Sequence, residues 1–373
     1  MGYQQGALEI RMTDTLPDPG FWRGKRVFLT GHTGFKGAWL TMWLHRLGAD
    51  VTGFALPAGE PSLYADAGIG RLARSVIGDI RDRQALQAAL RAAEPQVVLH
   101  LAAQALVRPS YQQPVETFAT NVMGTVHLLE AACAVPDVRA VVVVTTDKVY
   151  ENREWAWAYR ETDALGGHDP YSASKACAEV VTSAWRRSFL GAHSGRPTVN
   201  LATARAGNVI GGGDWSADRL VPDCIRAFSV GQSVAIRNPA STRPWQHVLE
   251  PLCGYLLLAE RLHAGESDFP DAFNFGPALD DVLPVTKVVA GLARAWGEDA
   301  SWHVTAGDHP HEAGFLAVDP ALARARLGWR PRHRLAGALE WTGRWYRHHA
   351  AGQDAAALID ADIQQYMTLG VDP

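Results

Sequence analysis

Three features are scarce or missing in this sequence of 373 residues, and each absence excludes a class of protein. The four cysteines form no C-x-x-C pair, which argues against a zinc site and a disulfide framework. The net charge is -4 without a run of lysine and arginine, which argues against a nucleic-acid partner. The most apolar short run, 140–144, is too short to cross a membrane, and residues 1–20 contain no secretion signal. We therefore expect a soluble, cytoplasmic protein with no metal site and no membrane partner.

A regular alternation of apolar and amphipathic segments fills the first half of the chain. The apolar segments predict strands at 26–30, 50–54, 75–78, 97–101, 140–145 and 198–203. The amphipathic segments predict helices at 37–47, 83–93, 116–132 and 171–189. Strands that are apolar throughout and alternate with helices are typical of a parallel sheet covered on both faces. The expected fold class is therefore α/β, a doubly wound Rossmann sheet with a smaller C-terminal lobe for substrate.

The regularity of this pattern divides the chain into three parts. Residues 1–20 are polar and aperiodic, and we expect them to form a loosely held extension. Residues 21–204 are expected to form the Rossmann domain. In residues 205–373, glycines, prolines and short mixed segments replace the alternation. This third part is predicted to be mainly the second lobe, with some segments that return to the Rossmann domain.

A glycine-rich turn joins the first predicted strand to the first predicted helix. Gly31, Gly34 and Gly37 have the spacing G-x-x-G-x-x-G, one residue wider at its start than the dinucleotide-binding fingerprint. Glycines let the backbone approach a pyrophosphate, whose charge then lies at the N-terminus of the following helix. We expect a dinucleotide cofactor here and not an ordinary tight turn. The residues expected to hold it in this turn are Gly31, Thr33, Gly34, Phe35, Lys36 and Gly37.

Further cofactor contacts are expected after the other strands of the sheet. No arginine that could neutralise a 2′-phosphate follows the second strand directly, so NAD is favoured over a 2′-phosphorylated cofactor. No acidic residue follows it either, so the adenosine ribose of NAD lacks its usual carboxylate partner. Asp79, with Ile80, is expected at the adenine, and the alternative is an N-cap for the next helix. Asn121, inside a predicted helix, has either a polar role near the active site or a place in solvent. The remaining expected contacts are Leu101, Ala102, Ala103, Gln104 and Thr145.

Tyr171 and Lys175 form a Y-x-x-x-K pair in the predicted helix 171–189. A spacing of four residues puts both side chains on one face of the helix, where the ammonium can lower the pKa of the phenol. The resulting phenolate can take the proton of a substrate hydroxyl while its carbon gives up hydride. Because the pair follows a glycine-rich turn and five predicted strands, we interpret it as catalytic and in contact with the cofactor, and not as a surface pair.

The segment Thr145-Thr146-Asp147-Lys148 follows the fifth predicted strand, at the sheet edge where such folds bind ligands. A plain dehydrogenase or an epimerase needs little more than a hydroxyl here. The adjacent carboxyl and amine of Asp147 and Lys148 offer an acid and a base for a second chemical step. The alternative is an ion pair that only ends the strand.

Five stretches carry a resemblance that runs from about Phe21 to Tyr346: 31–40 (GHTGFKGAWL), 145–155 (TTDKVYENREW), 166–175 (GGHDPYSASK), 205–223 (RAGNVIGGGDWSADRLVPD) and 243–251 (RPWQHVLEP). With them the sequence resembles the CDP-glucose 4,6-dehydratase family, in the nucleotide-sugar branch of the extended short-chain dehydrogenases/reductases. Asp147-Lys148 is the most specific sign, because the related dTDP-glucose and GDP-mannose dehydratases carry an acidic pair there. Thr146 and Val149 depart from the family, which more often has Ser and Cys.

The resemblance implies a reaction and a role for each residue of the site. CDP-D-glucose would become CDP-4-dehydro-6-deoxy-D-glucose and water, with NAD reduced and reoxidised within one turnover. Tyr171, activated by Lys175, would remove the proton of the 4-hydroxyl, and Thr146 would hydrogen-bond the same oxygen. Lys148, in its neutral form, would then take the C5 proton, and Asp147 would protonate the departing C6 hydroxyl.

The resemblance also indicates the substrate contacts and the assembly. Asn208, Arg219 and Arg243 are expected to bind CDP-glucose, because arginine donors match a diphosphate. The alternative for each arginine is a place on the surface. Relatives commonly dimerise through two helices per subunit, so a homodimer or a dimer of dimers is expected through 116–132 and 171–189.

Two competing interpretations use the same fold. Another nucleotide-sugar dehydratase or a 4-epimerase would also use Tyr171 and Lys175, but an epimerase needs no acid–base pair, so Asp147-Lys148 argues against it. A non-catalytic NAD-binding protein could lose Tyr171 or Lys175, and both are present.

Overall fold

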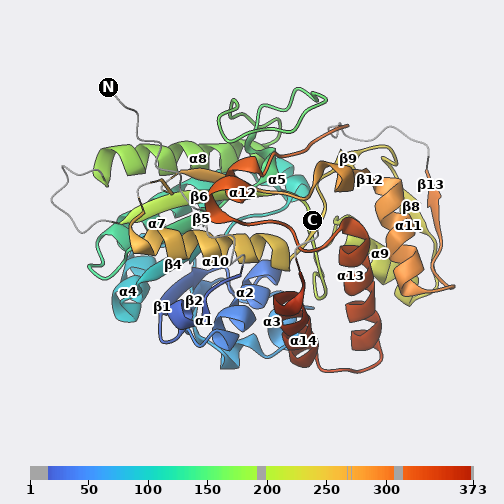
Figure 1. Cartoon of the computed structure of the whole chain (residues 1–373), viewed down its shortest axis with the longest axis horizontal. Coiled ribbons are helices and arrows are strands. Elements are labelled where there is room, and N and C mark those ends of the chain that lie inside the picture. Colours follow the sequence, from blue (N-terminus) through green and yellow to red (C-terminus); the bar gives the residue numbers. More distant parts are fainter. Residues whose placement is uncertain (1–15, 191–198, 267, 270, 306–313, 371–373) are drawn as a thin grey trace, which may run out of the picture.

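The computed structural model describes residues 16–190, 199–266, 268–269, 271–305 and 314–370, and its centre is a seven-stranded sheet (Figure 1). The strand order is β11-β6-β5-β4-β1-β2-β3, and all neighbouring strands in this sheet are parallel. The predicted doubly wound α/β fold is therefore confirmed. The strands are β1 (Arg26–Thr30), β2 (Asp50–Ala55), β3 (Arg74–Ile77), β4 (Val97–His100), β5 (Ala140–Val144), β6 (Asn200–Ala206) and β11 (Ala272–Phe275).

Each face of the sheet carries its own apolar core, because alternate residues of a strand point to opposite faces. In β1, Val27 and Leu29 belong to a core with apolar residues of α2 and α10. Phe28, between them, belongs to a second core with residues of α4 and α7, against which α8 packs. The helices of these two layers are α2 (Phe35–Arg46), α4 (Arg83–Ala93), α7 (Gly124–Cys133), α8 (Pro170–Phe189) and α10 (Leu249–Ala264).

The predicted helix 116–132 is not one regular helix. It consists of α6 (Pro114–Phe118), a π-helical turn η2 (Ala119–Met123) and α7. Such wide turns are rare and occur often at functional sites. Here the turn contains the buried side chain of Asn121, which bonds to two other segments described below. A short helix before it, α5 (Val107–Gln112), was not predicted, and Pro109 in its first turns breaks the helical pattern.

The other helix predictions agree with the structure to within a few residues. Helix α4 has the predicted bounds, and α8 begins one residue before its predicted start. Asp169 caps α8 by accepting a hydrogen bond from the Ser172 N–H at 2.9 Å, and Pro170 occupies the first position. The predicted strand 198–203 begins at residue 198, which lies outside the described residues, and β6 continues to Ala206.

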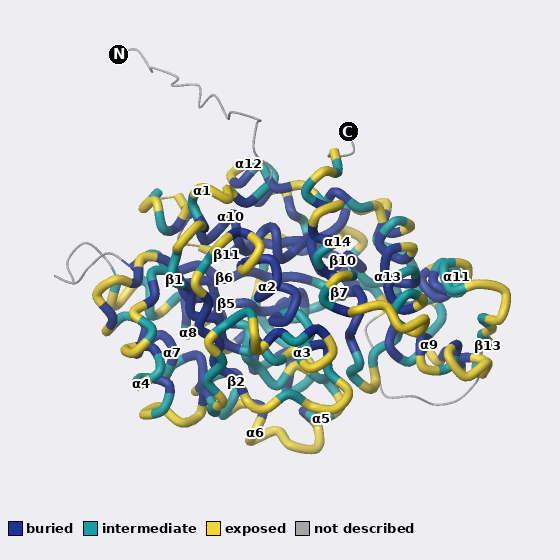
Figure 2. Tube along the Cα trace, turned by 90° about the horizontal axis from the view of Figure 1, so that it is seen from below, coloured by how far each residue is buried: buried dark blue, intermediate teal, exposed yellow. Residues whose placement is uncertain are grey.

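The C-terminal lobe consists of helices and short strand pairs beside the sheet (Figures 1 and 2). Figure 2 shows buried residues concentrated around the sheet and exposed residues along the outer edge near α9, α11 and β13. Helix α10 and strand β11 pack back onto the sheet. The predicted boundary after residue 204 falls inside β6, and the division into domains stays a prediction. The elements of the lobe and of the C-terminal segment are β7 (Val209–Ile210), α9 (Leu220–Ser229), β8 (Val234–Ile236), β9 (Thr242–Arg243), β10 (Gln246–His247), β12 (Leu283–Pro284), α11 (Val285–Trp296), β13 (Trp302–Val304), α12 (Ala321–Leu327), α13 (Leu335–Ala350) and α14 (Ala355–Thr368).

The predicted N-terminal extension differs from the structure at its end. Residues 1–15 lie outside the described residues. A short helix, α1 (Pro19–Trp22), begins before residue 20, and Trp22 is fully buried. The indole N–H of Trp22 donates to Glu260 Oε1 at 2.6 Å, which ties this helix to α10.

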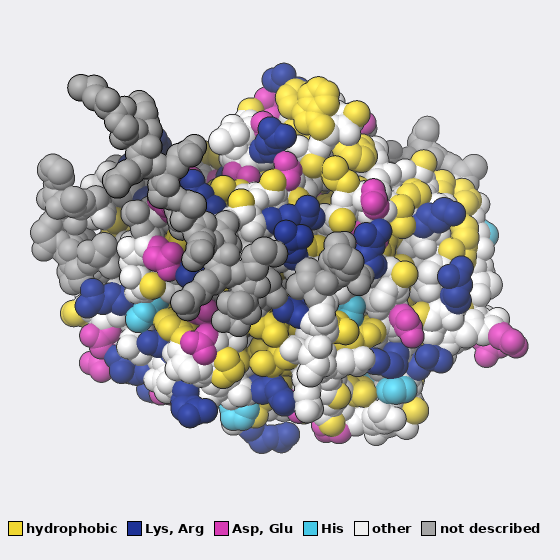
Figure 3. Space-filling model, in the orientation of Figure 1, with side chains coloured by type: hydrophobic (Ala, Val, Ile, Leu, Met, Phe, Trp, Pro, Cys, Tyr) yellow, Lys and Arg dark blue, Asp and Glu magenta, His cyan; other side chains and the backbone are white. Residues whose placement is uncertain are grey.

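The surface carries charges of both signs. On the face shown in Figure 3, basic and acidic side chains are interspersed with apolar ones. Within the described ranges, no helix combines the length and the apolar character that a membrane crossing requires. The expected absence of nucleic-acid and membrane partners and the cytoplasmic location stay predictions.

Candidate active site

The glycine-rich turn after β1 is shaped by close backbone contacts. Gly31 has a φ of +77°, and a Cβ atom there would lie 2.8 Å from the Ala102 nitrogen. A Cβ atom on Gly37 would overlap the carbonyl oxygen of Gly31. Gly34 is the N-cap of α2, where no side chain caps the helix and no acid occupies the first turn. The first N–H groups of α2 are therefore arranged to bind an anion such as a pyrophosphate.

The substitution Gly37→Ala is expected to lower the free energy of unfolding by about 2 kcal/mol, because backbone must move to admit the methyl group. Urea unfolding without added cofactor measures this change. Gly34→Ala is the matched control, since its Cβ atom would lie 3.4 Å from the Gly31 oxygen, which is an ordinary contact. Equal losses in the two variants would contradict this account of the turn.

Asp79 follows β3 and is not the N-cap of the next helix, so that alternative is wrong. Asp82 caps α4 by accepting hydrogen bonds from two backbone N–H groups. Asp79 accepts from the Arg81 backbone at 2.8 Å and from its guanidinium at 2.9 Å, and these hydrogen bonds hold the pKa of Asp79 below its usual value. The Ile80 side chain is buried in the core, so only its backbone is left for a ligand.

The loop 101–104 after β4 is fixed from two sides. Its first two N–H groups donate to Thr30 Oγ1, each at 3.1 Å. Asn121 accepts from the Gln104 N–H at 2.8 Å and donates to the Gln104 oxygen at 3.0 Å. The Asn121 amide also donates to Ser174 Oγ on α8 at 2.8 Å. Asn121 is therefore buried and joins the loop to α8, and the solvent-facing alternative is wrong.

Asp147 and Lys148 lie in the short helix η3 (Asp147–Val149), directly after β5. The Asp147 side chain is fully buried, and its Oδ1 accepts from Thr146 Oγ1 at 2.9 Å and from Lys148 Nζ at 3.3 Å. Its other oxygen has no hydrogen-bond partner among the described residues and lies against Gly207. Lys148 is only partly buried, with 29% of its side chain exposed. One carboxyl oxygen is thus positioned by neighbours while the second stays available for a proton transfer.

Tyr171 lies in the first turn of α8 and is buried. Burial raises the pKa of Tyr171 to about 12, against the smaller lowering effects of a hydrogen bond with Thr146 and of the Arg219 charge. Lys175 is not among the largest effects on this pKa, and the prediction that its ammonium lowers the pKa of Tyr171 stays a prediction. The Lys175 ammonium donates to the Val144 oxygen at 2.9 Å, and the desolvation of the phenol is the larger effect.

Several cations gather around Asp147 and Tyr171. Burial lowers the pKa of Lys175 to about 8. Burial, together with the nearby charges of Arg219 and Lys175, lowers the pKa of Lys36 to about 7. Lys36 comes from the glycine-rich turn, so that turn also contributes a side chain to this cluster. A concentration of positive charge at a sheet edge favours an anionic ligand, such as a nucleotide diphosphate. The cations of the cluster are Lys36, Lys148, Lys175 and Arg219.

The three predicted substrate residues lie on different elements. Arg219 precedes α9 and pairs with Asp214 Oδ2 at 2.8 Å. Asn208 follows Gly207, and its side-chain oxygen is buried without a hydrogen-bond partner among the described residues. Arg243 lies on β9, where its guanidinium donates to the Thr242 oxygen at 2.9 Å. The residue after Arg243, Pro244, packs against Gly207, so both segments border Asp147.

Two buried charged residues beneath this site were not predicted. Glu179 on α8 and Arg205 on β6 form an ion pair at 2.9 Å. The two residues are far apart in the sequence, so the sequence gives no sign that they pair. Glu179 by itself, however, lies four residues after Lys175. A helix places such residues on one face, and this spacing is the signal that could have identified Glu179.

Sequence comparisons identify relatives of the whole chain. A family model described as GDP-mannose 4,6 dehydratase matches residues 28–341. The CDP-glucose 4,6-dehydratase of Salmonella typhimurium is 50% identical over 353 residues, which cover 94% of this chain and 98% of that protein. The dTDP-glucose 4,6-dehydratase of Streptomyces griseus is 30% identical over 331 residues, which cover 87% of this chain and 94% of that protein.

Solved structures share the fold. The dTDP-glucose 4,6-dehydratase of Streptomyces venezuelae, with NAD and TYD bound, is 25% identical with a TM-score of 0.74 and covers 89% of this chain and 99% of its own. The UDP-glucose 4-epimerase of Thermotoga maritima, with UDP-glucose, has the same TM-score of 0.74 at 21% identity, covers 87% of this chain and 99% of its own, and shows likeness of fold alone. Together with the sequence matches, these findings show that the chain belongs to the nucleotide-sugar 4,6-dehydratase family.

Proposed function

We propose that this chain is an NAD-dependent CDP-D-glucose 4,6-dehydratase, a hydro-lyase that forms CDP-4-dehydro-6-deoxy-D-glucose and water. The observation that carries the proposal is the Asp147–Lys148 pair beside Tyr171 in a chain half identical to a CDP-glucose 4,6-dehydratase. Removing water from a sugar needs an acid and a base in addition to the group that takes the hydroxyl proton. This cluster supplies all three groups.

The glycine-rich turn fits NAD. Its backbone approaches closely at Gly31, and the first turn of α2 presents N–H groups that no side chain caps. This turn would hold NAD, and the bound cofactor would supply the hydride-transfer chemistry that links C4 and C6 of the sugar. Neither an acid nor an arginine directly follows β2, which agrees with a cofactor that lacks a 2′-phosphate. The proposed contacts are Gly31, Thr33, Gly34, Phe35, Lys36, Gly37, Asp79, Ile80, Leu101, Ala102, Ala103, Gln104, Thr145, Tyr171 and Lys175.

In the oxidation at C4, Tyr171 takes the proton of the 4-hydroxyl and Thr146 hydrogen-bonds the same oxygen. The phenol must be ionised to act, and burial opposes this. The hydrogen bond with Thr146 and the Arg219 charge favour the phenolate. Arg219, with Asn208 and Arg243, is also proposed to bind the diphosphate and the sugar.

In the elimination, the ketone at C4 acidifies the C5 hydrogen. Lys148, in its neutral form, takes this proton, and Asp147, in its protonated form, gives its proton to the C6 hydroxyl, which leaves as water. Lys148 afterwards returns a proton to C5. Overall the hydrogen on C4 moves to C6, and the C6 hydroxyl leaves with one proton. The 3.3 Å distance between Lys148 Nζ and Asp147 Oδ1 places the base and the acid next to each other.

The direct test is a product assay with CDP-glucose and NAD. We expect a 4-keto-6-deoxy sugar, detected by its absorbance in alkali, without net formation of reduced cofactor. UDP-glucose, dTDP-glucose and GDP-mannose are parallel substrates. Turnover of another nucleotide sugar alone would overturn the assignment to CDP-glucose while the dehydration stands.

A 4-epimerase is the second candidate, because the fold also matches an epimerase. An epimerase product keeps its C6 hydroxyl, so NMR of the product separates the two activities. The acid–base pair at residues 147 and 148 favours dehydration, since inversion at C4 needs no proton transfer at C5 or C6.

We also propose a homodimer, or a dimer of dimers, through the helices around 116–132 and 171–189. Large apolar side chains in and beside these helices are exposed. Val115 on α6 is 78% exposed and Val180 on α8 is 56% exposed. Met123 in η2 is exposed as well. Their exposure supports an interface there, since a second copy would remove these apolar side chains from water.

A further inference from the structure

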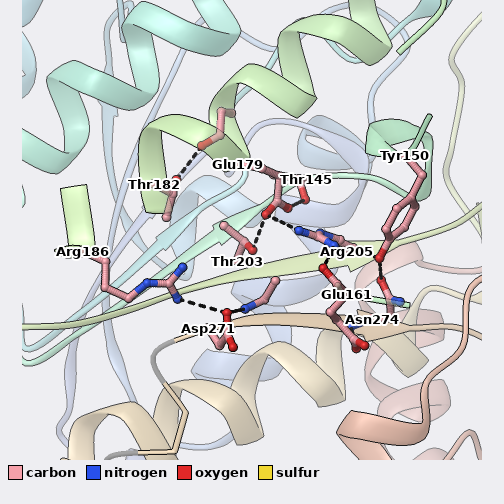
Figure 4. A network of polar contacts seen from close by, with 12 residues as sticks. Thr145, Tyr150, Glu161, Glu179, Thr182, Arg186, Thr203, Arg205, Asp271 and Asn274 are labelled. Atoms are coloured by element: carbon pink, nitrogen blue, oxygen red, sulfur yellow. Dashed lines mark hydrogen bonds and ion pairs between the residues drawn. The ribbon is translucent and has the colours of Figure 1, made fainter. Parts of the chain in front are cut away.

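A buried ion pair joins helix α8 to strand β6, and Figure 4 shows the polar contacts around it. Arg205 on β6 and Glu179 on α8 have side chains that are 4% and 3% exposed, and Arg205 donates to Glu179 Oε2 at 2.9 Å. Breaking a pair of this kind leaves an uncompensated buried charge, which is strongly unfavourable. Neither residue has a role in the proposed reaction steps.

Glu179 holds the residue that precedes the catalytic segment. Its Oε1 accepts from Thr145 Oγ1 at 2.5 Å, and its Oε2 accepts from Thr203 Oγ1 at 2.7 Å (Figure 4). Lys175, one helical turn away on α8, donates to the oxygen of Val144. Helix α8 thus hydrogen-bonds to Val144 and Thr145, the two residues immediately before Thr146.

Arg205 holds the residue that follows the catalytic segment. Its guanidinium donates to the hydroxyl of Tyr150 at 2.8 Å, and this hydroxyl donates to Asn274 Oδ1 at 2.7 Å (Figure 4). Tyr150 directly follows η3. Residues 146–149 are therefore anchored at both ends to one ion pair.

The charge of Glu179 also acts on Lys175. Burial lowers the pKa of Lys175, and Glu179 opposes this effect. Helix α8 contains no acidic residue other than Glu179, so without Glu179 the ammonium would have no negative charge on its own helix. The titratable groups on the surrounding elements are Glu179 on α8, Lys36 on α2, His100 on β4, Asp147 and Lys148 on η3, and Arg205 on β6.

We propose that Glu179 is a positioning residue for the dehydration: it fixes the segment that carries Thr146, Asp147 and Lys148, and its negative charge keeps Lys175 cationic. The inference deepens the proposed function and rests on it for its kinetic consequence. Its effect on Lys175 can be measured without substrate, so the two proposals can fail separately.

The test is Glu179→Gln, which keeps the shape of the side chain and its ability to accept from Thr145. Without the carboxylate, Lys175 loses the group that raises its pKa, and its ammonium deprotonates at lower pH. If catalysis needs cationic Lys175, the alkaline limb of kcat against pH moves to lower pH by about one unit. Thr203→Val is the control, because it removes one hydrogen bond to Glu179 and no charge, so the limb stays in place.

A second measurement follows the melting temperature against pH without substrate. The pKa of Lys175 is about 8 in the folded chain and 10.5 for an ordinary lysine side chain, so the folded state disfavours the cation. Burying the Lys175 ammonium therefore lowers the stability of the fold by its full amount below pH 8. This loss disappears as the pH rises toward 10.5. In Glu179→Gln this gain begins at lower pH than in the wild type. This result is expected even if CDP-glucose is not the substrate.

Glu179→Gln leaves Arg205 without its counter-charge, so the single variant could fail to fold. The double variant Glu179→Gln with Arg205→Met removes both charges and gives the same acid shift, since Lys175 still lacks the carboxylate. A folded single or double variant in which neither the kinetic limb nor the stability curve moves would overturn the proposal. A shifted stability curve in a protein inactive on CDP-glucose would overturn only the proposed substrate.

Discussion

The variant Tyr171→Phe is expected to lower kcat for the dehydration on the order of 10³-fold while substrate still binds. Phenylalanine fills the same buried space but has no hydroxyl to take the proton of the 4-hydroxyl. We expect a loss of stability of about 1 kcal/mol, because the hydroxyl loses its hydrogen bond with Thr146. The backbone N–H of residue 171 still donates to Ser110 Oγ at 3.1 Å. The product assay gives kcat, and calorimetric titration with CDP-glucose gives the affinity.

Tyr366→Phe is the matched control for this change. Tyr366 is also fully buried, and its hydroxyl donates to Glu250 Oε2 at 2.8 Å, on the α10–α14 side of the molecule. Loss of this hydrogen bond costs about 1 kcal/mol of stability and leaves kcat unchanged. If Tyr171→Phe retained more than about a tenth of wild-type kcat, another group would have to remove the proton.

The fold was predictable where the chain repeats one local pattern. The apolar strands β4 and β5 are buried along their whole length, and the sequence alone places them in a parallel sheet. Strand β11 was not predicted, although a return of some C-terminal segments to the Rossmann domain was. It has only four residues, and its pairing with β6 depends on contacts between segments about 70 residues apart. The π-helical turn η2 was not predicted either, and its buried Asn121 has hydrogen-bond partners on other elements.

The candidate site was predictable where its residues are adjacent in sequence. Asp147 and Lys148 follow a strand and form an ion pair at 3.3 Å, and Tyr171 and Lys175 are both buried on α8, one helical turn apart. Neither the Glu179–Arg205 ion pair nor the desolvation that raises the pKa of Tyr171 can be read from local spacing. Both depend on how closely α8 packs against β5 and β6, which only the folded chain shows.

The variant Lys148→Met is expected to stop turnover after the first step, with kcat lowered about 10²- to 10⁴-fold. Methionine has a similar length but no amine, so the C5 proton stays in place and water is not lost. The oxidation at C4, for which we propose Tyr171 as the base, is expected to be kept. Bound cofactor therefore becomes reduced and stays reduced, which its absorbance shows in a rapid-mixing experiment. In D₂O, NMR should detect no exchange of the C5 hydrogen.

Lys175→Met is the control for Lys148→Met. It tests whether the arrest after the first step comes from loss of the base or only from loss of a positive charge in the site. Lys175 lies by the strand end at Val144 and not beside the Asp147 carboxyl, where Lys148 Nζ lies 3.3 Å from Oδ1. Its loss is expected to slow the oxidation itself, so reduced cofactor does not accumulate. Normal water loss by Lys148→Met, or C5 exchange at the wild-type rate, would show that another group is the base. Asp147 would then be the nearest alternative, because its second carboxyl oxygen has no hydrogen-bond partner among the described residues.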